Sequence, residues 1–313
     1  MLAYLTARLF ALLPVLLVVA VVVFMLVHVT PGDPARVLLG QDATDAQVAA
    51  LRHALGLDRP LAVQFVWWLG RGLRGDLGTS FFLHIPVTAD ILQHVGPTAT
   101  LSVLGLAVAL LIGIPVGIVS AVLRNSWLDQ ASQALAMLGA AVPSFWLGLS
   151  LIVLFAVDLG WLPSSGYRSP AGGIWQSLHY LILPALALGL PNSSLIIRFT
   201  RSSLLDVLGN DYIRTAHAKG LSLERVIAHH ALRNALVPIL TVVGLTFAAL
   251  MGGAVVTETV FSLPGIGQLV VSSVLRRDYP VIQGVILMVA TVYVVINLAV
   301  DLMYFVVDPR VRY

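Results

Sequence analysis

Six apolar runs of about twenty residues dominate this chain of 313 residues, and they constrain its fold more than any other feature. A helix needs about 20 apolar residues to cross a bilayer, where only helices and closed barrels satisfy their backbone hydrogen bonds. Hydrophobic residues make up 58% of the chain and charged residues 11%. We therefore expect an all-α polytopic membrane protein. The six predicted transmembrane helices lie at roughly 9–29, 99–122, 132–156, 178–198, 236–257 and 281–307.

The first run, residues 9–29, is expected to remain in the protein as a membrane anchor. It is longer than the core of a secretory signal, and the Thr-Pro-Gly-Asp-Pro that follows offers no small-residue cleavage site. The chain contains no cysteine, which excludes disulfides, thiolate metal ligands and cysteine nucleophiles.

Basic residues are unevenly distributed among the segments that join the runs. With the N-terminus in the cytoplasm, inner segments carry ten of the eighteen basic residues, and outer segments of about twice the total length carry eight. Positive charge is retained on the cytoplasmic side, so both termini are predicted to be cytoplasmic. The net charge of +3 is small, and its distribution between the two sides of the membrane is more informative than its size. We expect no nucleic-acid partner. The inner basic residues are Arg8, Arg124, Arg198, Arg201, Arg214, Lys219, Arg225, Arg233, Arg310 and Arg312.

Residues 31–98 predict a small helical subdomain outside the cytoplasm. Thr44 and Gln47 have the spacing of a capping box, Gly56 follows as a helix stop, and Pro60 can open a second helix. Its tryptophans suit either the aromatic belt at the membrane interface or packing within the subdomain. The expected organisation is an N-terminal transmembrane helix at 1–30, this subdomain at 31–98, a five-helix permease core at 99–307 with a cytoplasmic loop at 199–235, and a cytoplasmic tail at 308–313.

A basic, helix-prone segment at 211–238 separates two apolar runs and includes Lys219, the only lysine of the chain. Such a charged segment must lie outside the hydrocarbon. Asp211 can cap a first short helix, Gly220 can close it in the left-handed conformation, and Ser222 can cap a second. The segment therefore predicts a cytoplasmic helix-turn-helix.

The chain lacks a nucleotide-binding motif. A P-loop requires glycines before its lysine, and the residues that precede Lys219 include Arg214, Thr215 and Ala216 instead. If ATP drives this protein, the nucleotide binds to a partner. His229 and His230 are adjacent, so a helix would point them about 100° apart, which does not favour a shared metal ion. We expect neither a cofactor nor a metal in this chain.

Two carboxylates, Glu258 and Asp301, lie closest to apolar surroundings. An unpaired carboxylate in a membrane is costly, so each is a candidate for the substrate pathway. Glu258 can instead cap a neighbouring helix. Asp301 follows Asn297 by one helical turn, which favours a hydrogen bond between helices.

Small residues and prolines predict how the spans pack and bend. Gly113 and Gly117 form a GxxxG pattern, and Gly252 precedes another glycine, which suits close helix contact. Prolines inside apolar runs are expected to kink their helices. They are Pro115, Pro143, Pro184 and Pro191.

Stretches along nearly the whole chain resemble a known family of permeases. The loop at 211–238 resembles the coupling loop of membrane permeases in binding-protein-dependent ABC importers. The chain is similar to the first of the two permeases of dipeptide, oligopeptide, glutathione and nickel importers. Arg214 and Thr215 replace the glutamate and alanine of the general loop pattern, as in the peptide-importer branch. The supporting stretches are 28–40, 55–65, 75–80, 198–222, 230–241, 252–269, 276–284 and 301–313.

The resemblance implies a type I permease fold in the bacterial inner membrane. Its partners would be a second permease, two cytosolic P-loop ATPases that bind ATP and Mg²⁺, an extracytoplasmic substrate-binding protein and the lipid bilayer. The chain itself would not be an enzyme. Arg214 and Lys219 would dock to acidic groove residues of an ATPase, and the less favoured alternative is that they serve only to retain the loop inside. The residues implied in coupling are Asp211, Tyr212, Arg214, Thr215, Ala216, Lys219 and Gly220.

The expected cargo is dipeptides or short oligopeptides, and glutathione or nickel is the alternative within the same family. An ion-coupled secondary transporter and a membrane scaffold are rival classes. The scarcity of charges within the spans and the lack of a sequence repeat argue against the ion-coupled transporter.

Overall fold

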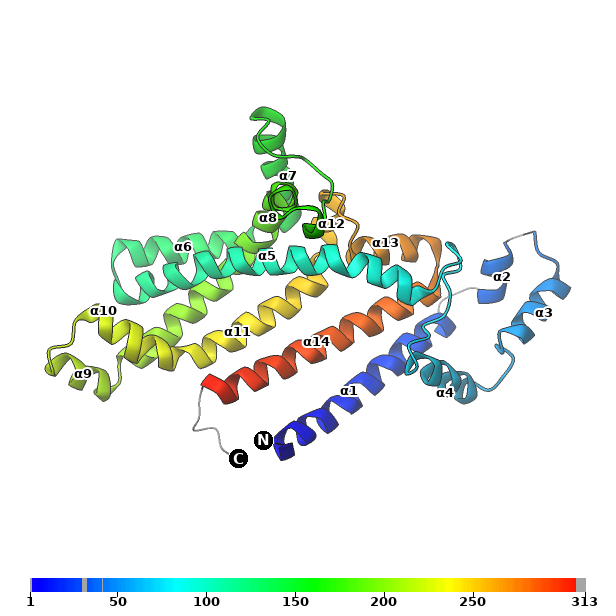
Figure 1. Cartoon of the computed structure of the whole chain (residues 1–313), viewed down its shortest axis with the longest axis horizontal. Coiled ribbons are helices and arrows are strands. Elements are labelled where there is room, and N and C mark those ends of the chain that lie inside the picture. Colours follow the sequence, from blue (N-terminus) through cyan, green and yellow to red (C-terminus); the bar gives the residue numbers. More distant parts are fainter. Residues whose placement is uncertain (1, 30–32, 41, 308–313) are drawn as a thin grey trace. The chain divides into compact units, whose positions relative to one another are not determined.

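The computed structural model describes residues 2–29, 33–40 and 42–307 (Figure 1). Helices form nearly all of the regular structure, and the one β-bridge among these residues joins Thr79 to Pro86. The elements in chain order are α1 (Leu2–Val29), α2 (Pro34–Leu39), α3 (Asp45–Ala54), α4 (Leu61–Gly72), α5 (Val87–Val122), α6 (Trp127–Ala141), α7 (Ser144–Leu151), η1 (Ile152–Asp158), η2 (Pro170–Gly172), α8 (Ile174–Leu208), α9 (Asp211–Ala218), α10 (Leu223–Arg225), η3 (Val226–Ala231), α11 (Leu232–Gly253), α12 (Val255–Val260), α13 (Ile266–Arg276) and α14 (Tyr279–Val307).

Five helices of the described chain are long and apolar enough to cross a membrane, and the number is six if a bent pair counts as one span. The bent pair corresponds to the predicted span at 132–156. Pro143 separates α6 from the helix at Ser144–Asp158, and the two are bent by 97°. Proline lacks the N–H that would continue the backbone ladder, so the predicted kink is here a break. By contrast, Pro115 lies within an uninterrupted α5, and Pro184 and Pro191 lie within an uninterrupted α8.

The described chain divides into two compact units. One comprises residues 1–95 with 268–294, and the other comprises residues 96–267 with the chain that follows residue 294. The domain boundaries expected from sequence remain a prediction, and the expected tail at 308–313 lies outside the described residues. α5 begins at Val87, well before the predicted start at residue 99, because a helix can extend past its apolar run.

Local sequence signals account for the small helices of the first unit. Thr44 and Gln47 form the predicted capping box, with the Gln47 Oε1 atom accepting from the Thr44 amide at 2.9 Å. Gly56 has a φ of +68°, as expected of a helix stop. Pro60 immediately precedes α4. Trp68 packs beside Phe24 with ring centroids 5.8 Å apart.

The predicted roles of the tryptophans divide between two environments. Trp68 contributes to packing within the first unit. Trp67 is exposed and therefore remains available for a membrane interface.

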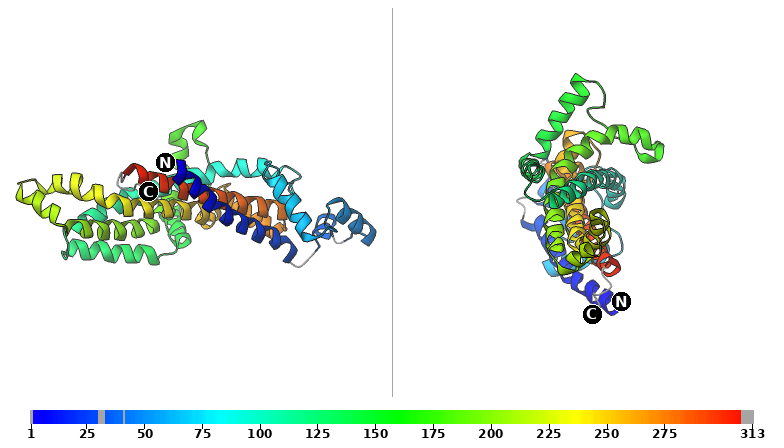
Figure 2. Two further views of the ribbon diagram at one scale, coloured as in Figure 1. Left: turned by 90° about the horizontal axis from the view of Figure 1, so that it is seen from below. Right: turned by 90° about the vertical axis from the view of Figure 1, so that its left-hand side faces the viewer.

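The second unit is built around α8, which packs against both α6 and α11 (Figures 1 and 2). The GxxxG pattern of α5 lies against α8. A Cβ atom at Gly113 would lie 2.6 Å from Ile196 Cγ2, and one at Gly117 would lie 2.6 Å from Thr200 Cβ. Glycine is therefore needed for this close approach, as predicted. Gly252 has no atom within 4 Å of such a position, so it does not mark a helix contact.

Candidate coupling site

The short helix α9 follows the end of α8, and a turn joins it to α10, so the predicted helix-turn-helix is present (Figure 1). Its second helix is not a separate short one, because α10 continues through η3 into α11 as one helix of 30 residues, Leu223–Gly252. Asn210 occupies the N-cap position of α9, and Asp211 is the first helical residue, so the prediction that Asp211 caps this helix is wrong by one position. The Asp211 carboxylate still lies at the positive end of the helix dipole. Ser222 occupies the N-cap of α10, as predicted, but its side chain makes no capping hydrogen bond.

The turn between α9 and α10 depends on Gly220. Its φ is +80°, in the left-handed region that strains other residues. The Gly220 amide donates to the His217 carbonyl at 2.9 Å, and the Leu221 amide donates to the Ala216 carbonyl at 3.3 Å. This pair of bonds is a Schellman motif, which satisfies the last carbonyls of α9. A Cβ at Gly220 would meet no atom within 4 Å, so conformation rather than space requires glycine here.

An apolar face fixes the helix-turn-helix to the long helices. Ile213, Ala216 and Val226 are buried in one cluster with Leu204 of α8 and Ala235 of α11. Burial of such side chains stabilises the contact by roughly 25 cal/mol per Å² of apolar surface. If α9 moves, the ends of α8 and α11 that pack against it must therefore move as well.

The opposite face of α9 is charged and exposed. Arg214 Nη1 lies 3.4 Å from Asp211 Oδ1, with side-chain exposures of 79% and 94%. The Tyr212 hydroxyl accepts a hydrogen bond from the side-chain amide of Asn234, Nδ2, at 3.0 Å. Of the seven residues implied in coupling, Ala216 is buried in the apolar cluster and the other six are exposed: Asp211, Tyr212, Arg214, Thr215, Lys219 and Gly220.

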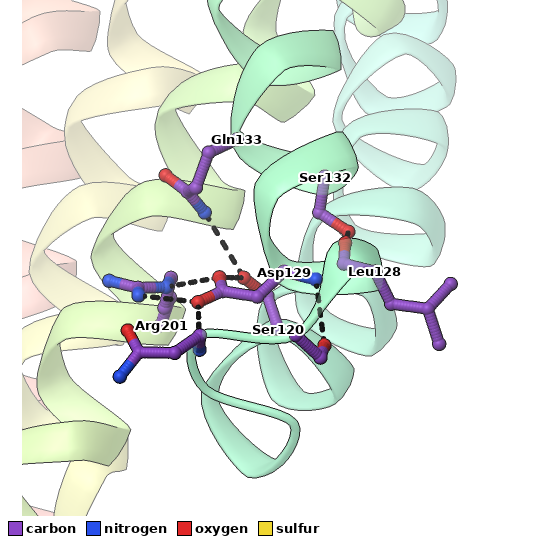
Figure 3. Close-up of polar contacts among 8 residues, drawn as sticks. Ser120, Leu128, Asp129, Ser132, Gln133 and Arg201 are labelled. Atoms are coloured by element: carbon purple, nitrogen blue, oxygen red, sulfur yellow. Dashed lines mark hydrogen bonds and ion pairs between the residues drawn. The ribbon is translucent and has the colours of Figure 1, made fainter.

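An ion pair that the sequence did not reveal lies at the N-terminal end of α6. Arg201 of α8 binds both oxygens of Asp129, through Nε at 2.7 Å and Nη2 at 2.8 Å (Figure 3). The same carboxylate accepts from Ser120 Oγ at 2.5 Å and from the Asn125 amide at 2.9 Å. The network joins α5, α6 and α8. A carboxylate in the first turn of α6 was visible in the sequence, but its partner lies 72 residues away.

Glu258 is fully buried and lies beside the chain that enters α13. Thr98 Oγ1 donates to Glu258 Oε1 at 2.5 Å and accepts from the Ile266 amide at 2.8 Å. A Cβ at Gly265 would lie 2.3 Å from the Glu258 carboxyl carbon, so glycine makes room for the carboxylate. The arrangement favours the structural alternative for Glu258, because in this conformation solvent does not reach it.

Asp301, the other candidate for the pathway, lies on α14 and is half-buried. A role of Asp301 in the substrate pathway stays a prediction. No group of three or more His, Asp or Glu residues with metal-binding geometry occurs in the part of the chain that the structure describes.

The fold is that of a helical membrane protein with several spans, and comparisons with known proteins identify its family. Residues 113–313 match the family described as "Binding-protein-dependent transport system inner membrane component". Residues 1–102 match the N-terminal domain of such membrane components.

Curated relatives match along their whole length. The chain is 48% identical over 314 residues to the glutathione transport system permease protein GsiC of Salmonella choleraesuis, covering 100% of both chains. It is 44% identical over 333 residues to the dipeptide transport system permease protein DppB of Alkalihalophilus pseudofirmus, again covering 100% of both. It is 45% identical to a probable peptide ABC transporter permease of Sinorhizobium fredii, with 99% of each chain covered.

A solved structure shares the fold. The MetNI methionine ABC transporter in an inward-facing conformation aligns with a TM-score of 0.60 at 19% identity, covering 70% of this chain and 96% of that one.

The chain belongs to the family of inner-membrane components of binding-protein-dependent transport systems. It is a multi-pass permease subunit of an ABC importer, a family that works with ATPase and substrate-binding partners. This membership supports neither the ion-coupled transporter nor the scaffold.

Proposed function

We propose that this chain is one of two permease subunits that form the pathway of an ATP-driven importer of dipeptides or short oligopeptides in the bacterial inner membrane. Relatives named as dipeptide, peptide and glutathione permeases support this cargo class. Both termini would face the cytoplasm, as the distribution of basic residues favours. ATP and Mg²⁺ would bind to two partner ATPases, and a binding protein would deliver the peptide.

The single observation that carries the mechanism is the division of α9 into an anchored and an exposed face. The buried face, with Ile213 and Ala216, transmits motion of the helix to α8 and α11. The exposed face presents Arg214 and Lys219, which suit an acidic groove on an ATPase. An ATPase that closes on ATP would thereby move the cytoplasmic ends of both long helices.

Charge reversal at Lys219 tests the docking role. In the reconstituted complex, Lys219→Glu is expected to uncouple ATP turnover from transport, because like charges would face each other across the docking surface. The matched control is Arg233→Glu, an exposed basic residue at the start of α11. Coupled transport at the normal rate in the Lys219 variant would exclude this docking role.

The cargo is tested on the cognate binding protein. Calorimetry with a dipeptide, a longer peptide, glutathione and Ni²⁺ is expected to give tight binding of the peptides. Tight binding of glutathione alone, or of Ni²⁺ without peptide affinity, would replace the peptide proposal with the corresponding alternative in the family.

A further inference from the structure

The first compact unit contains a cavity of about 210 Å³ that the coupling mechanism does not use. We call it the outer cavity. Its aromatic walls include Phe24 of α1, Trp67 and Trp68 of α4, and Tyr279 of α14. Its polar groups include His28 and Gln64, which are hydrogen-bonded to each other at 3.1 Å. The cavity therefore combines stacking surface with hydrogen-bonding groups.

A buried hydroxyl group in this wall points to a ligand. Tyr279 is only 4% exposed, and its hydroxyl oxygen has no hydrogen-bond partner in the described structure. Buried tyrosine hydroxyls usually find a partner, because an unsatisfied buried donor costs about 1 to 3 kcal/mol. A polar group of a molecule in the outer cavity would supply that partner.

The charge of the lining favours an anion. Arg59 and Arg71 both line the outer cavity, and none of its described lining residues is Asp or Glu. The Arg59 guanidinium stacks 3.9 Å from the centre of the Trp67 ring, which holds it in place. Arg71 also binds Asp76 at 2.8 Å, so its charge is partly neutralised. A phosphodiester matches this set of cationic and neutral donors.

An apolar groove of about 840 Å³ lies next along the same helices. It is formed by α1 from Phe10 to Ala20, by α4 and by α14, and Trp68 lines both the groove and the outer cavity. At 1.5 Å per residue, the groove begins at Ala20, about 12 Å along α1 from His28 of the outer cavity, and continues toward Phe10. An acyl chain that spans one leaflet, half of the roughly 30 Å hydrocarbon thickness, therefore reaches the groove from the outer cavity. Leu13 and Leu17, on this stretch, are exposed.

We propose that the outer cavity and the groove together bind one anionic glycerophospholipid. Its phosphodiester would contact Arg59 and the Tyr279 hydroxyl, and one acyl chain would lie in the groove past Trp68. A transmembrane helix of another protein could fill the groove, but it would offer no fixed negative charge to the outer cavity. A cationic, aromatic cavity next to an apolar groove therefore fits a lipid better than it fits a transmembrane helix.

Two glycines of α4 provide a matched test. A Cβ at Gly72, which lines the groove, would meet only Leu77 Cδ2 at 3.9 Å, and one at Gly70 would meet nothing within 4 Å. Both positions therefore accept a side chain, but only Gly72→Leu would fill the groove. Native mass spectrometry of the complete importer complex, with added palmitoyl-oleoyl phosphatidylglycerol, is expected to show strong loss of bound lipid in Gly72→Leu and normal lipid in Gly70→Leu.

The headgroup contact has its own test. Tyr279→Phe removes only the hydroxyl and is expected to weaken phosphatidylglycerol binding by about threefold to tenfold, as for one hydrogen bond. Tyr293→Phe, an exposed position on α14, is the control. Phosphatidylethanolamine and a diacylglycerol of the same chains should bind more weakly, the diacylglycerol most of all. Equal retention of all three, or normal lipid in Gly72→Leu, would overturn the proposal.

The competing occupant is a helix of the second permease. Because the chain has no cysteine, Met288→Cys in the groove provides a unique thiol. Phosphatidylglycerol with a photoreactive acyl chain is expected to label residues around this position, and added phosphatidylglycerol should slow its reaction with a maleimide. A disulfide or bifunctional crosslink from this thiol to the second permease, with no lipid label, would assign the groove to protein instead.

Discussion

Arg201 and Asp129 form a two-pronged ion pair between α8 and α6, with distances of 2.7 and 2.8 Å. The Asp129 side chain is 4% exposed and that of Arg201 is 24% exposed. A shielded pair of this kind costs more to break than a surface pair, because removal of one partner leaves the other charge uncompensated. The pair holds together the helix ends from which the candidate coupling site extends.

Arg201→Ala is expected to destabilise the protein by about 3 kcal/mol, because the Asp129 carboxylate would stay buried without its counter-charge. Thermal unfolding of the purified complex in detergent measures the effect. Arg198→Ala, at an exposed position one turn earlier on α8, is the control and should change the melting temperature little. Similar losses in the two variants would mean that the ion pair contributes no more than an exposed arginine.

Gly220→Ala is expected to cost about 1 to 2 kcal/mol, since alanine in the left-handed conformation is strained. The turn between α9 and α10 should open, and ATP turnover should be less tightly linked to transport. Gly209→Ala is the control, because Gly209 ends α8 with a φ of −74°. Limited proteolysis of the loop, together with the ratio of transport to ATP hydrolysis, reports both effects. Unchanged values for Gly220→Ala would exclude a conformational role for this glycine.

Gly113→Ala is expected to separate α5 from α8 and to destabilise the protein by about 1 to 3 kcal/mol through overpacking. The added methyl would lie 2.6 Å from Ile196 Cγ2, and both atoms belong to packed helices. Gly96→Ala adds the same methyl to α5 where no atom lies within 4 Å, so it should be neutral or slightly stabilising. Thermal unfolding of the two variants, measured in parallel, shows whether close packing against α8 or helix propensity determines the effect of a methyl group on α5.

Thr98→Val is expected to destabilise the protein by about 1 to 3 kcal/mol, since the hydroxyl bridges the Glu258 carboxylate and the Ile266 amide. Valine keeps the shape of threonine but removes the bridge. Thr98→Ser keeps the hydroxyl and should retain most of the stability. If serine and valine have the same effect in thermal unfolding, the methyl contact rather than the hydrogen bond is what matters at this position.

Several local features followed correctly from the sequence because neighbouring residues create them. The capping box of Thr44 and Gln47 lies within four residues, and the left-handed turn at Gly220 depends on a single missing Cβ. The break at Pro143 was predicted only as a kink. Its angle of 97° depends on what α6 and the following helix pack against, which no local pattern contains.

Within the candidate sites, the contacts between residues far apart in the chain could not be predicted from the sequence. The partner of Asp129 lies 72 residues away, and Thr98, which binds Glu258, lies 160 residues away. A lone carboxylate at the end of an apolar run looks the same whether it lines a pathway or is buried against another helix. The same applies to Tyr279, whose unpartnered hydroxyl becomes visible only when its burial is known.

The sequence by itself determined that this chain is a helical membrane permease with a charged helix-turn-helix, because hydrophobic length, turn chemistry and family motifs are local or additive properties. Only the tertiary structure decided which face of α9 is buried, that Arg201 meets Asp129, and that Glu258 is enclosed by Thr98 and Gly265. These outcomes depend on how helices distant in sequence pack. The free energy of each contact exists only once both helices are in place, so no single segment can encode it.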